Sequence, residues 1–363
     1  PFVGRRRELD VLEDLKEQAA SGEGQVAGLA GEAGSGKSRL VQEFLRRTRD
    51  PEALYLSGRC LSYGAGIPYL PLLYMLRNAW GISEGDSALA VTGKVRASLT
   101  EVGLDPAAHL PYLLLLLGVK EGTETLADLS PQALQTRTFS ILRQMILNAA
   151  QERLVVFEME DLHWVDETSE EFLAYLVEGM AAARILVLLT YRTGYLPRWL
   201  EKSYATQITM RRLSAQDSQA VVDSVLQRAK LPEDLARVIL EKAEGNPFFL
   251  EELTRSLVER QSWADLSVPD TIHGVLMARI DRLPEEHKRL LQTASVLGRE
   301  FSLDLLYALW DRPDTLAPLL GDLKRWEFLY EAPVAEKPTY FFKHALTQET
   351  VYQTLLTGKR QAL

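Results

Sequence analysis

Residues 31–38 read Gly31-Glu-Ala-Gly-Ser-Gly-Lys-Ser38, which fits the pattern G-x-x-x-x-G-K-S/T. An apolar run at 25–30 precedes this stretch, and Leu40, Val41 and Phe44 follow it at helical spacing. A glycine-rich loop between a strand and a helix binds phosphate groups, because its backbone N–H groups and the positive end of the helix dipole face the anion. The sequence therefore predicts a site for a nucleoside triphosphate.

The residue types of this loop suit that chemistry. Gly31, Gly34 and Gly36 let the backbone adopt positive φ and approach a ligand closely. Lys37 is expected to hold its ammonium against the β- and γ-phosphates, and the Ser38 hydroxyl to ligate Mg²⁺. The residues expected to line the nucleotide here are Gly31, Glu32, Ala33, Gly34, Ser35, Gly36, Lys37, Ser38 and Arg39.

Composition indicates a multidomain protein without disulfides. The chain has 363 residues, 46% of them hydrophobic, which is enough for roughly two to three domains. Cys60 is the single cysteine, so an internal disulfide or a catalytic cysteine pair is impossible, and a small buried hydrophobe is the expected role. No apolar run approaches the ~20 residues of a membrane span. We expect a cytoplasmic protein and, since the chain opens on Pro1, a piece of a longer one.

The charge balance bears on the class of partner. Lysine and arginine number 41 against 50 acids, a net charge of −9, so the broad basic footprint of a nucleic-acid-binding protein is missing. Arg5, Arg6 and Arg7 form the densest basic cluster, at the start of an amphipathic helical pattern, where a solvated face is expected. The composition thus argues against direct nucleic-acid binding and favours a nucleotide as the ligand.

Five short apolar segments alternate with helical patterns in the first two hundred residues. Because near-continuous apolar strands are typical of a parallel sheet covered on both faces, we expect an α/β fold with helices on each side, the P-loop NTPase architecture. Proline-punctuated helical runs over about 61–131 look like a helical insertion. The predicted strands are 26–30, 53–57, 154–159, 185–190 and 207–210.

The third of these segments ends in acids, with Glu158, Glu160 and Asp161 close together. Carboxylates at the C-terminal end of a parallel strand lie in the crevice where such sheets bind ligands. Glu160 is expected to hold Mg²⁺ and Asp161 to polarise the attacking water, although the spacing leaves open which acid has which role. Glu158 shares a strand face with Glu160 and would be a costly buried charge unless it is paired or near the metal.

Polar residues next to these two strand ends complete the candidate site. Arg192 follows the fourth segment and could sense the γ-phosphate through charge-assisted hydrogen bonds, the alternative being a surface arginine. His163 is more simply a structural residue, with contact to the nucleotide as the alternative. Asp166 is expected to cap the next helix.

The C-terminal part predicts helices followed by a small hairpin. The helical pattern that ends at Gly245-Asn-Pro247 indicates a helix stop and a new helix. Beyond 268, helical faces lead to two segments, 327–331 and 340–343, that could pair around Pro333 and Pro338. Helices followed by such a hairpin make a winged helix, here without a strongly basic recognition helix.

Several motifs together resemble STAND-class signalling ATPases, relatives of the AAA+ group. In detail the chain is similar to the ATPase module of bacterial proteins that carry a class III adenylate cyclase domain before it and tetratricopeptide repeats after it. The motifs are Phe2-Val-Gly-Arg-Arg-Arg-Glu8, the phosphate loop, Glu160-Asp-Leu-His-Trp164, Thr190-Tyr-Arg192 and Gly245-Asn-Pro-Phe-Phe-Leu-Glu-Glu252.

The resemblance implies further contacts with the nucleotide. Phe2, Val3, Gly4 and Arg5 would border the adenine and ribose, with Pro247 of a helical lid pressing on the base from the other side. His344 would contact the β-phosphate of ADP and hold the module closed, although Ala345 stands where many relatives have aspartate. The implied domains are an ATPase domain at 1–210, a lid at 211–267 and a winged helix at 268–363.

A nucleotide-operated switch is the resulting functional hypothesis. ADP would keep the module closed, exchange for ATP would release the winged helix and permit self-association, and slow hydrolysis to ADP and phosphate would reset it. The regulated output would be an attached domain such as the cyclase. The alternatives are a DNA-associated AAA+ ATPase, an ATP-dependent transcriptional regulator and a metabolic kinase.

Overall fold

A computed structural model describes residues 2–61, 64–83, 85–227, 232–258, 271–331 and 338–355. Its contacts divide the chain into two compact units, one over residues 2–211 and one from Arg212 to the C-terminal end. The predicted lid boundary at 267/268 and Pro333 of the predicted hairpin lie outside the described residues.

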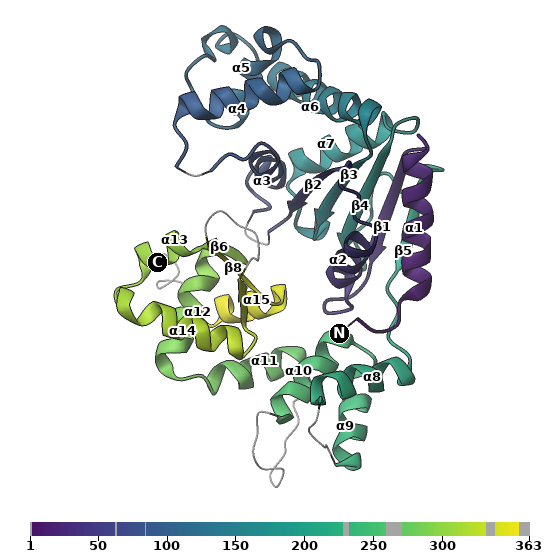
Figure 1. Ribbon diagram of the computed structural model, residues 1–363, viewed down its shortest axis with the longest axis vertical. Coiled ribbons are helices and arrows are strands. Elements are labelled where there is room, and N and C mark those ends of the chain that lie inside the picture. Colours follow the sequence, from purple (N-terminus) through teal and green to yellow (C-terminus); the bar gives the residue numbers. More distant parts are fainter. Residues whose placement is uncertain are drawn as a thin grey trace. The chain divides into compact units, whose positions relative to one another are not determined.

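The first unit is built on a five-stranded sheet of order β2-β3-β4-β1-β5 (Figure 1). All four strand pairs are parallel, so the carboxyl ends of the strands meet at one edge. Every residue of the central strands β1 and β4 is buried, which explains their continuous apolar sequence. The strands are β1 Gln25–Ala30, β2 Leu54–Arg59, β3 Val155–Glu160, β4 Ile185–Tyr191 and β5 Ala205–Thr209.

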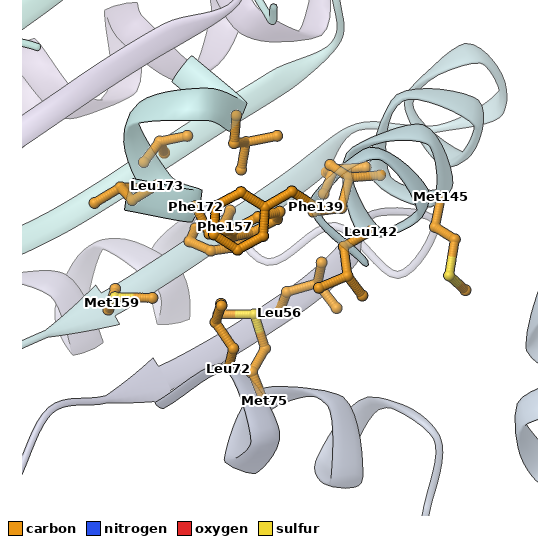
Figure 2. Packing of buried hydrophobic residues seen from close by; sticks show 14 of the residues in the cluster. Leu56, Leu72, Met75, Phe139, Leu142, Met145, Phe157, Met159, Phe172 and Leu173 are labelled. Carbon is orange, nitrogen blue, oxygen red and sulfur yellow. The ribbon is translucent and has the colours of Figure 1, made fainter. Parts of the chain in front are cut away.

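Helices cover both faces of this sheet, which confirms the predicted fold class. On one face α1 (Arg6–Ala20) and α2 (Lys37–Arg47) contribute their apolar stripes to a core that includes Leu12 and Phe44. On the other face α3 (Leu70–Ala79) packs on β2 and α6 (Pro131–Glu152) on β3, and α7 (Glu167–Glu178) packs against both helices. Figure 2 shows Phe139 of α6, Phe157 of β3 and Phe172 of α7 in this second core.

The predicted insertion is helical. It contains α3, α4 (Ala88–Glu101), α5 (Pro106–Leu116) and the short 3₁₀ helix η1 (Glu124–Leu126), and α6 follows it. Ser87 and Asp105 cap α4 and α5 through their side-chain oxygens. Asp166, the predicted cap of α7, accepts from the Ser169 N–H and also from the Tyr69 N–H, both at 2.9 Å. The insertion is therefore anchored at the start of α7.

The second unit begins with the helices α8 (Ala215–Leu226), α9 (Glu233–Ala243) and α10 (Pro247–Val258). The predicted stop between α9 and α10 is confirmed: Glu244 and Gly245 have φ of 46° and 76°. A Cβ on Gly245 would lie 2.6 Å from the Leu213 carbonyl oxygen, so this turn requires glycine. Leu213 N–H in turn donates to the Gly245 carbonyl at 2.9 Å.

The rest of the second unit combines helices with a small antiparallel sheet. The predicted hairpin is confirmed, because β7 pairs with β8 in antiparallel register. A third strand, β6, joins the other side of β8 and was not predicted. The elements are α11 Ile272–Asp281, α12 Glu285–Leu297, β6 Glu300–Ser302, α13 Leu303–Leu309, α14 Pro313–Arg325, β7 Leu329–Glu331, β8 Thr339–Phe342 and α15 Ala345–Gln353. This is the composition of a winged helix.

In the described ranges, no helix combines the length and the apolarity needed to cross a bilayer.

Candidate functional site

The loop at 31–38, called the phosphate cradle from here on, has the predicted left-handed backbone at two of its three glycines, whereas the prediction of positive φ is wrong for Gly31. Gly34 and Gly36 have φ of 77° and 93°, in the left-handed region that favours glycine. A Cβ on Gly31 would lie 2.7 Å from the Ser35 hydroxyl oxygen and 2.7 Å from Cβ of Met210. The tight turn therefore depends on glycine, and α2 begins directly after it at Lys37.

Lys37 lies inside the cradle. Its Nζ donates to the carbonyl oxygens of Gly31 at 2.9 Å and Glu32 at 3.0 Å. The pKa of Lys37 is lowered, mainly by burial. The carboxylates of Asp161 and Glu160 oppose this shift, and the Arg192 guanidinium adds to it. The charges of the two strand ends therefore reach this ammonium, and all four residues lie at one edge of the sheet.

The cradle also contains a polar atom with no partner. The Ser35 hydroxyl is buried and makes no hydrogen bond. A buried hydroxyl without a partner is costly unless a ligand or water satisfies it. Together with the left-handed glycines and the helix N-terminus at Lys37, this atom fits a phosphate group in the cradle. Gly31, Ser35 and Lys37 are buried, Ala33, Gly34, Gly36 and Ser38 are half-buried, and Glu32 and Arg39 are exposed.

Residues 160–164, called the acid turn here, follow β3. Glu160 is buried and forms an ion pair with Arg59 of β2, whose Nε lies 2.8 Å from the Glu160 Oε2. Asp161 has φ 59°, and its N–H donates to the Thr190 hydroxyl of β4 at 3.0 Å. A non-glycine residue in this region is held by its surroundings, a feature that clusters at functional sites.

Arg59 is a residue of this site that sequence reasoning missed. Its partner is 101 positions away, and the two residues meet only because β2 and β3 pair with Arg59 opposite Glu160. The same pairing places Ser57 opposite Glu158, and the Ser57 hydroxyl donates to Glu158 at 3.0 Å. Burial and the neighbouring Glu160 carboxylate raise the pKa of Glu158 to about 7. The raised pKa of Glu158 agrees with the predicted cost of burying its charge on this strand.

His163 lies beside the same charges. Both of its ring nitrogens are buried without a hydrogen-bond partner. Burial, with the positive charges of Arg192 and Lys37, lowers the pKa of His163 to about 4, so its ring is neutral at pH 7. The Arg192 guanidinium lies 5.7 Å from the centre of the Trp164 ring, within cation–π range. His163 is therefore a polar group at this edge without a protein partner.

The N-terminal arm, Phe2 to Arg5, also belongs to the first unit. All four residues are half-buried, and the Arg47 guanidinium lies 5.9 Å from the centre of the Phe2 ring. Arg5 donates to Ser35 O of the cradle at 3.3 Å. The arm thus runs beside the cradle.

Pro247 and His344 belong to the second unit. Pro247 is the first residue of α10, and His344 occupies the N-cap position of α15 without a capping hydrogen bond from its side chain. The His344 ring lies 4.4 Å from the ring of Phe248, and its Nε2 is buried without a partner. Burial lowers the pKa of His344 to about 3, against the opposing effect of Glu251, so the imidazole is neutral. The structure brings His344 next to the residue that follows Pro247.

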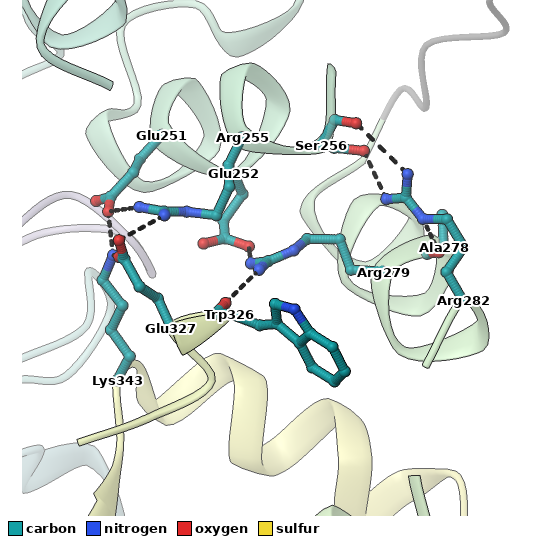
Figure 3. A network of polar contacts seen from close by, with 10 residues as sticks. All are labelled: Glu251, Glu252, Arg255, Ser256, Ala278, Arg279, Arg282, Trp326, Glu327 and Lys343. Atoms are coloured by element: carbon teal, nitrogen blue, oxygen red, sulfur yellow. Dashed lines mark hydrogen bonds and ion pairs between the residues drawn. The ribbon is translucent and has the colours of Figure 1, made fainter. Parts of the chain in front are cut away.

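Six charged side chains on and next to α10 form a network of ion pairs, called the α10 charge cluster here; Figure 3 shows them. The Arg255 guanidinium bridges Glu251 at 2.9 Å and Glu327 at 2.7 Å, while Lys343 contacts both of these acids. Arg279 of α11 pairs with Glu252 and donates to the Trp326 carbonyl at 2.8 Å. The cluster consists of Glu251, Glu252, Arg255, Arg279, Glu327 and Lys343.

The cluster is charge-balanced and largely buried. The side chains of Arg279 and Glu252 are 2% and 1% exposed. Burial alone would raise the pKa of Glu251, but the Lys343 ammonium and its hydrogen bond lower it to about 2. Three acids and three bases thus compensate one another and connect α10 to α11, to the turn before β7 and to the end of β8.

The described residues contain no group of three or more histidine, cysteine or acidic side chains that could hold a metal ion. Mg²⁺ that is bound together with phosphates is usually held by only one or two protein ligands. Of the predicted metal ligands, Ser38 lies at the start of α2 and Glu160 at the end of β3, where Glu160 pairs with Arg59.

Comparison with known proteins agrees with this geometry. A family described as an AAA ATPase domain matches residues 1–188. A curated uncharacterised protein of Rhizobium meliloti is 28% identical, and the match covers 100% of this chain and 36% of that protein. The chain therefore spans about a third of the length of this relative.

One solved structure with a TM-score above 0.5 agrees with the fold. The crystal structure of a Signal Transduction ATPase with Numerous Domains (STAND) protein with a tetratricopeptide repeat sensor, from Pyrococcus horikoshii, is 16% identical with TM-score 0.57. The match covers 99% of this chain and 44% of that one. The ORC1 protein of Aeropyrum pernix in complex with DNA is 12% identical with TM-score 0.44, and the match covers 99% of this chain and 95% of that one.

Proposed function

Because this chain belongs to the AAA ATPase domain family, we propose that it binds ATP and ADP with Mg²⁺ and works as a nucleotide-dependent conformational switch. The family match includes the phosphate cradle and the acid turn. In this proposal slow hydrolysis of ATP to ADP and phosphate resets the switch.

One observation carries the proposal. Lys37 lies in the cradle while the charges of Asp161, Arg192 and Glu160 act on it. The Ser35 hydroxyl and both ring nitrogens of His163 are buried there without partners. A site with fixed charges and unsatisfied polar atoms suits a charged, oxygen-rich ligand, and a triphosphate matches it.

Each residue has a proposed role. Lys37 holds the β- and γ-phosphates, and Arg192 distinguishes the triphosphate from the diphosphate. Ser38 and Glu160 would hold Mg²⁺, which neutralises phosphate charge when it is bound. Asp161 orients the attacking water, and the hydrogen bond from the Arg59 guanidinium fixes the direction of the Glu160 carboxylate.

The second unit supplies the proposed readout. His344 and the Gly245–Pro247 turn are the residues that the resemblance assigns to ADP and the base, and both lie beside Phe248 in one compact unit. We place the output in a domain outside this chain, such as a class III adenylate cyclase, with self-association as the active form. This chain covers only 36% of its curated relative, which leaves room for such a domain in proteins of this kind.

The test measures nucleotide binding and phosphate release separately. Titration calorimetry with ADP and ATP in Mg²⁺ should show saturable binding by the purified chain. Asp161→Asn should leave ATP binding within about threefold and reduce phosphate release at least tenfold, because the water loses its orienting base. Asp14→Asn, an exposed acid on α1, is the matched control and should behave as wild type.

Two outcomes would contradict the proposal. Absence of ADP and ATP binding would remove the nucleotide site. Undiminished phosphate release in Asp161→Asn would remove the hydrolytic role of the acid turn. Salt-dependent binding of duplex DNA by the same preparation would favour the alternative, a DNA-associated AAA+ ATPase.

A further inference from the structure

Arg5 has an unusual backbone for an arginine. Its φ is 66° and that of Gly4 is 68°, so two consecutive residues of the N-terminal arm are left-handed. For a residue with a Cβ this conformation is strained and persists only where surrounding contacts hold it. The Arg5 side chain is only 7% exposed, and Arg6 and Arg7 next to it are exposed. Arg5 is therefore held in place by the protein.

The guanidinium of Arg5 joins three segments. Its Nη1 donates to the Glu8 carboxylate at 3.0 Å. Its Nη2 donates both to the carbonyl of Ser35 at 3.3 Å and to the carbonyl of Arg211 at 2.5 Å. Ser35 is part of the phosphate cradle, and Arg211 is the last residue of the first unit. One nitrogen thus bonds to the cradle and to the point where the chain leaves the ATPase unit.

The residue before Arg211 also contacts the cradle. The Met210 N–H donates to the Ala30 carbonyl at 2.7 Å, directly before the cradle. The Met210 side chain packs where Gly31 has no Cβ, at 2.7 Å from the position such an atom would take. Residues 210–211 therefore leave the sheet along the cradle, held by one backbone hydrogen bond, one side-chain contact and the Arg5 guanidinium.

We propose that Arg5 is a positioning residue that couples the phosphate cradle to the chain segment joining the two units. Because Ser35 and Arg211 share one donor nitrogen, a cradle ordered by a bound phosphate fixes the guanidinium and with it the Arg211 carbonyl. Loss of the phosphate loosens both. This inference rests on the proposed nucleotide switch. It names the contact through which a change at the nucleotide site would reach the segment that joins the two units.

The role proposed for the Arg5 side chain is separate from the contact with adenine and ribose that the resemblance implies, which stays a prediction. The resemblance places residues 2–5 along the adenine and ribose, which concerns the arm as a whole. The guanidinium itself is directed at one carboxylate and two protein carbonyls. Its planar fork can hold several acceptors in fixed directions, which a lysine ammonium does less well.

Hydrogen exchange at the joining segment tests the coupling. Exchange of the Met210 amide, measured by mass spectrometry on peptides covering 205–213, is compared with and without saturating ADP. In the wild type ADP should slow this exchange. In Arg5→Ala the slowing should fall roughly tenfold or more, the scale of one charge-assisted hydrogen bond, and Arg5→Lys should restore part of it.

The chain offers matched controls. Arg6→Ala and Arg7→Ala remove an exposed arginine from the same arm and should keep the wild-type response. The Leu213 amide bonds to Gly245 inside the second unit, so its exchange should not change in Arg5→Ala. A residue with a purely structural role would raise exchange equally with and without ADP, whereas coupling predicts that the ADP-dependent difference is lost.

The outcomes separate this inference from the function on which it rests. If wild type and Arg5→Ala both bind ADP and show the same slowing, the coupling is wrong and the nucleotide site stands. If the wild type binds no ADP, both fail. Should Arg5→Ala not fold, Glu8→Gln replaces it, because it keeps Arg5 and weakens its orientation. A reduced ADP response in Glu8→Gln supports the coupling, and a wild-type response overturns it.

Discussion

The phosphate cradle and the α10 charge cluster both bury charged side chains, but they differ in how those charges are compensated. Around the cradle, burial and neighbouring charges shift the pKa values of Lys37, Glu158 and His163. The Ser35 hydroxyl and the His163 nitrogens have no partner there. In the α10 charge cluster three acids face three bases, and each carboxylate has a cation within ion-pair distance.

The difference indicates what each region needs. A buried polar site with unsatisfied atoms costs stability until a ligand completes it, which is the property of a binding site. In a balanced cluster each charge is compensated by an opposite charge of the protein itself, so the cluster fixes how its elements pack, although such clusters add little net stability over an apolar core. Mutations should therefore affect ligand binding in the first region and folding in the second.

The largest expected effect follows loss of Glu252. Glu252→Ala leaves the Arg279 guanidinium buried without its carboxylate, and the free energy of unfolding of the second unit should fall by about 3–5 kcal/mol. This loss is measured by unfolding the protein in urea and detecting the unfolded second unit through its cleavage by a protease within residues 212–355. Glu241→Ala, an exposed acid on α9, should change stability by less than about 0.5 kcal/mol.

A double replacement sharpens this prediction. Glu252→Leu with Arg279→Met removes both charges and keeps the volume, so most of the lost stability should return. If the double variant is as unstable as Glu252→Ala, Glu252 does not stabilise the unit by compensating the charge of Arg279.

The second effect should appear in binding and not in stability. Lys37→Ala removes the ammonium from the cradle, so ATP affinity measured by calorimetry should fall about 100-fold or more. Because burial already disfavours this charge, the ligand-free protein should be no less stable in urea. Lys120→Ala, an exposed lysine, is the control. Unchanged affinity, or a stability loss as large as that of Glu252→Ala, would break the contrast between the regions.

A smaller effect is expected at the more exposed end of the α10 charge cluster. Lys343→Ala leaves Glu251 with Arg255, so about 1–2 kcal/mol of stability should be lost near pH 7. Since the folded pKa of Glu251 is depressed to about 2, its stabilisation is present above about pH 4.5 and is lost as pH falls towards 2. Between pH 4.5 and 2, Lys343→Ala should lose less unfolding free energy than wild type. Equal losses in the two proteins would argue against the ion pair between Lys343 and Glu251.

The last effect concerns Glu158 and appears only in the pH dependence of stability. Its folded pKa of about 7 lies above the ordinary value of 4.5, so the folded state holds the proton more tightly between these pH values. Its contribution to the unfolding free energy therefore falls as pH rises from about 4.5 to 7. Glu158→Gln lacks this loss, and its stability relative to wild type should increase over that range in urea titrations.

Because His163 also changes the stability over this pH range, the effect of Glu158 has to be measured as the difference between Glu158→Gln and wild type. Its folded pKa of about 4 is depressed from 6.5, so its own contribution to stability rises with pH over an overlapping range. The effect of His163 cancels in the difference between the two proteins. A difference that does not change between pH 5 and 8 would contradict the raised pKa of Glu158.

The sequence predicts the elements of the first unit well because its strands are buried on both faces. The apolar runs at 26–30 and 185–190 correspond to β1 and β4 within one residue at each end. The hairpin of the second unit is also confirmed. The strand β6 has only three residues, Glu300–Ser302, and such a short segment carries no recognisable alternation.

The candidate site is predictable only where it is local. The cradle and the acid turn are continuous stretches, so the spacing of their residues shows them. Arg59 meets Glu160 across 101 positions, and Arg5 meets Arg211 across 206, contacts that depend on strand order. Glu252 looks like an ordinary helix charge in the sequence, and only the packing of α11 shows that it is buried. The roles of the predicted site residues stay predictions.

The double hydrogen bond of Asp166 has a consequence for the helical insertion. One carboxylate oxygen both starts α7, directly after the acid turn, and holds the backbone of Tyr69, whose φ is 64° at the entrance to α3. The acid turn and the insertion therefore share an anchor. A displacement of the insertion at Tyr69 would therefore act on the same carboxylate oxygen that starts α7, close to the acid turn.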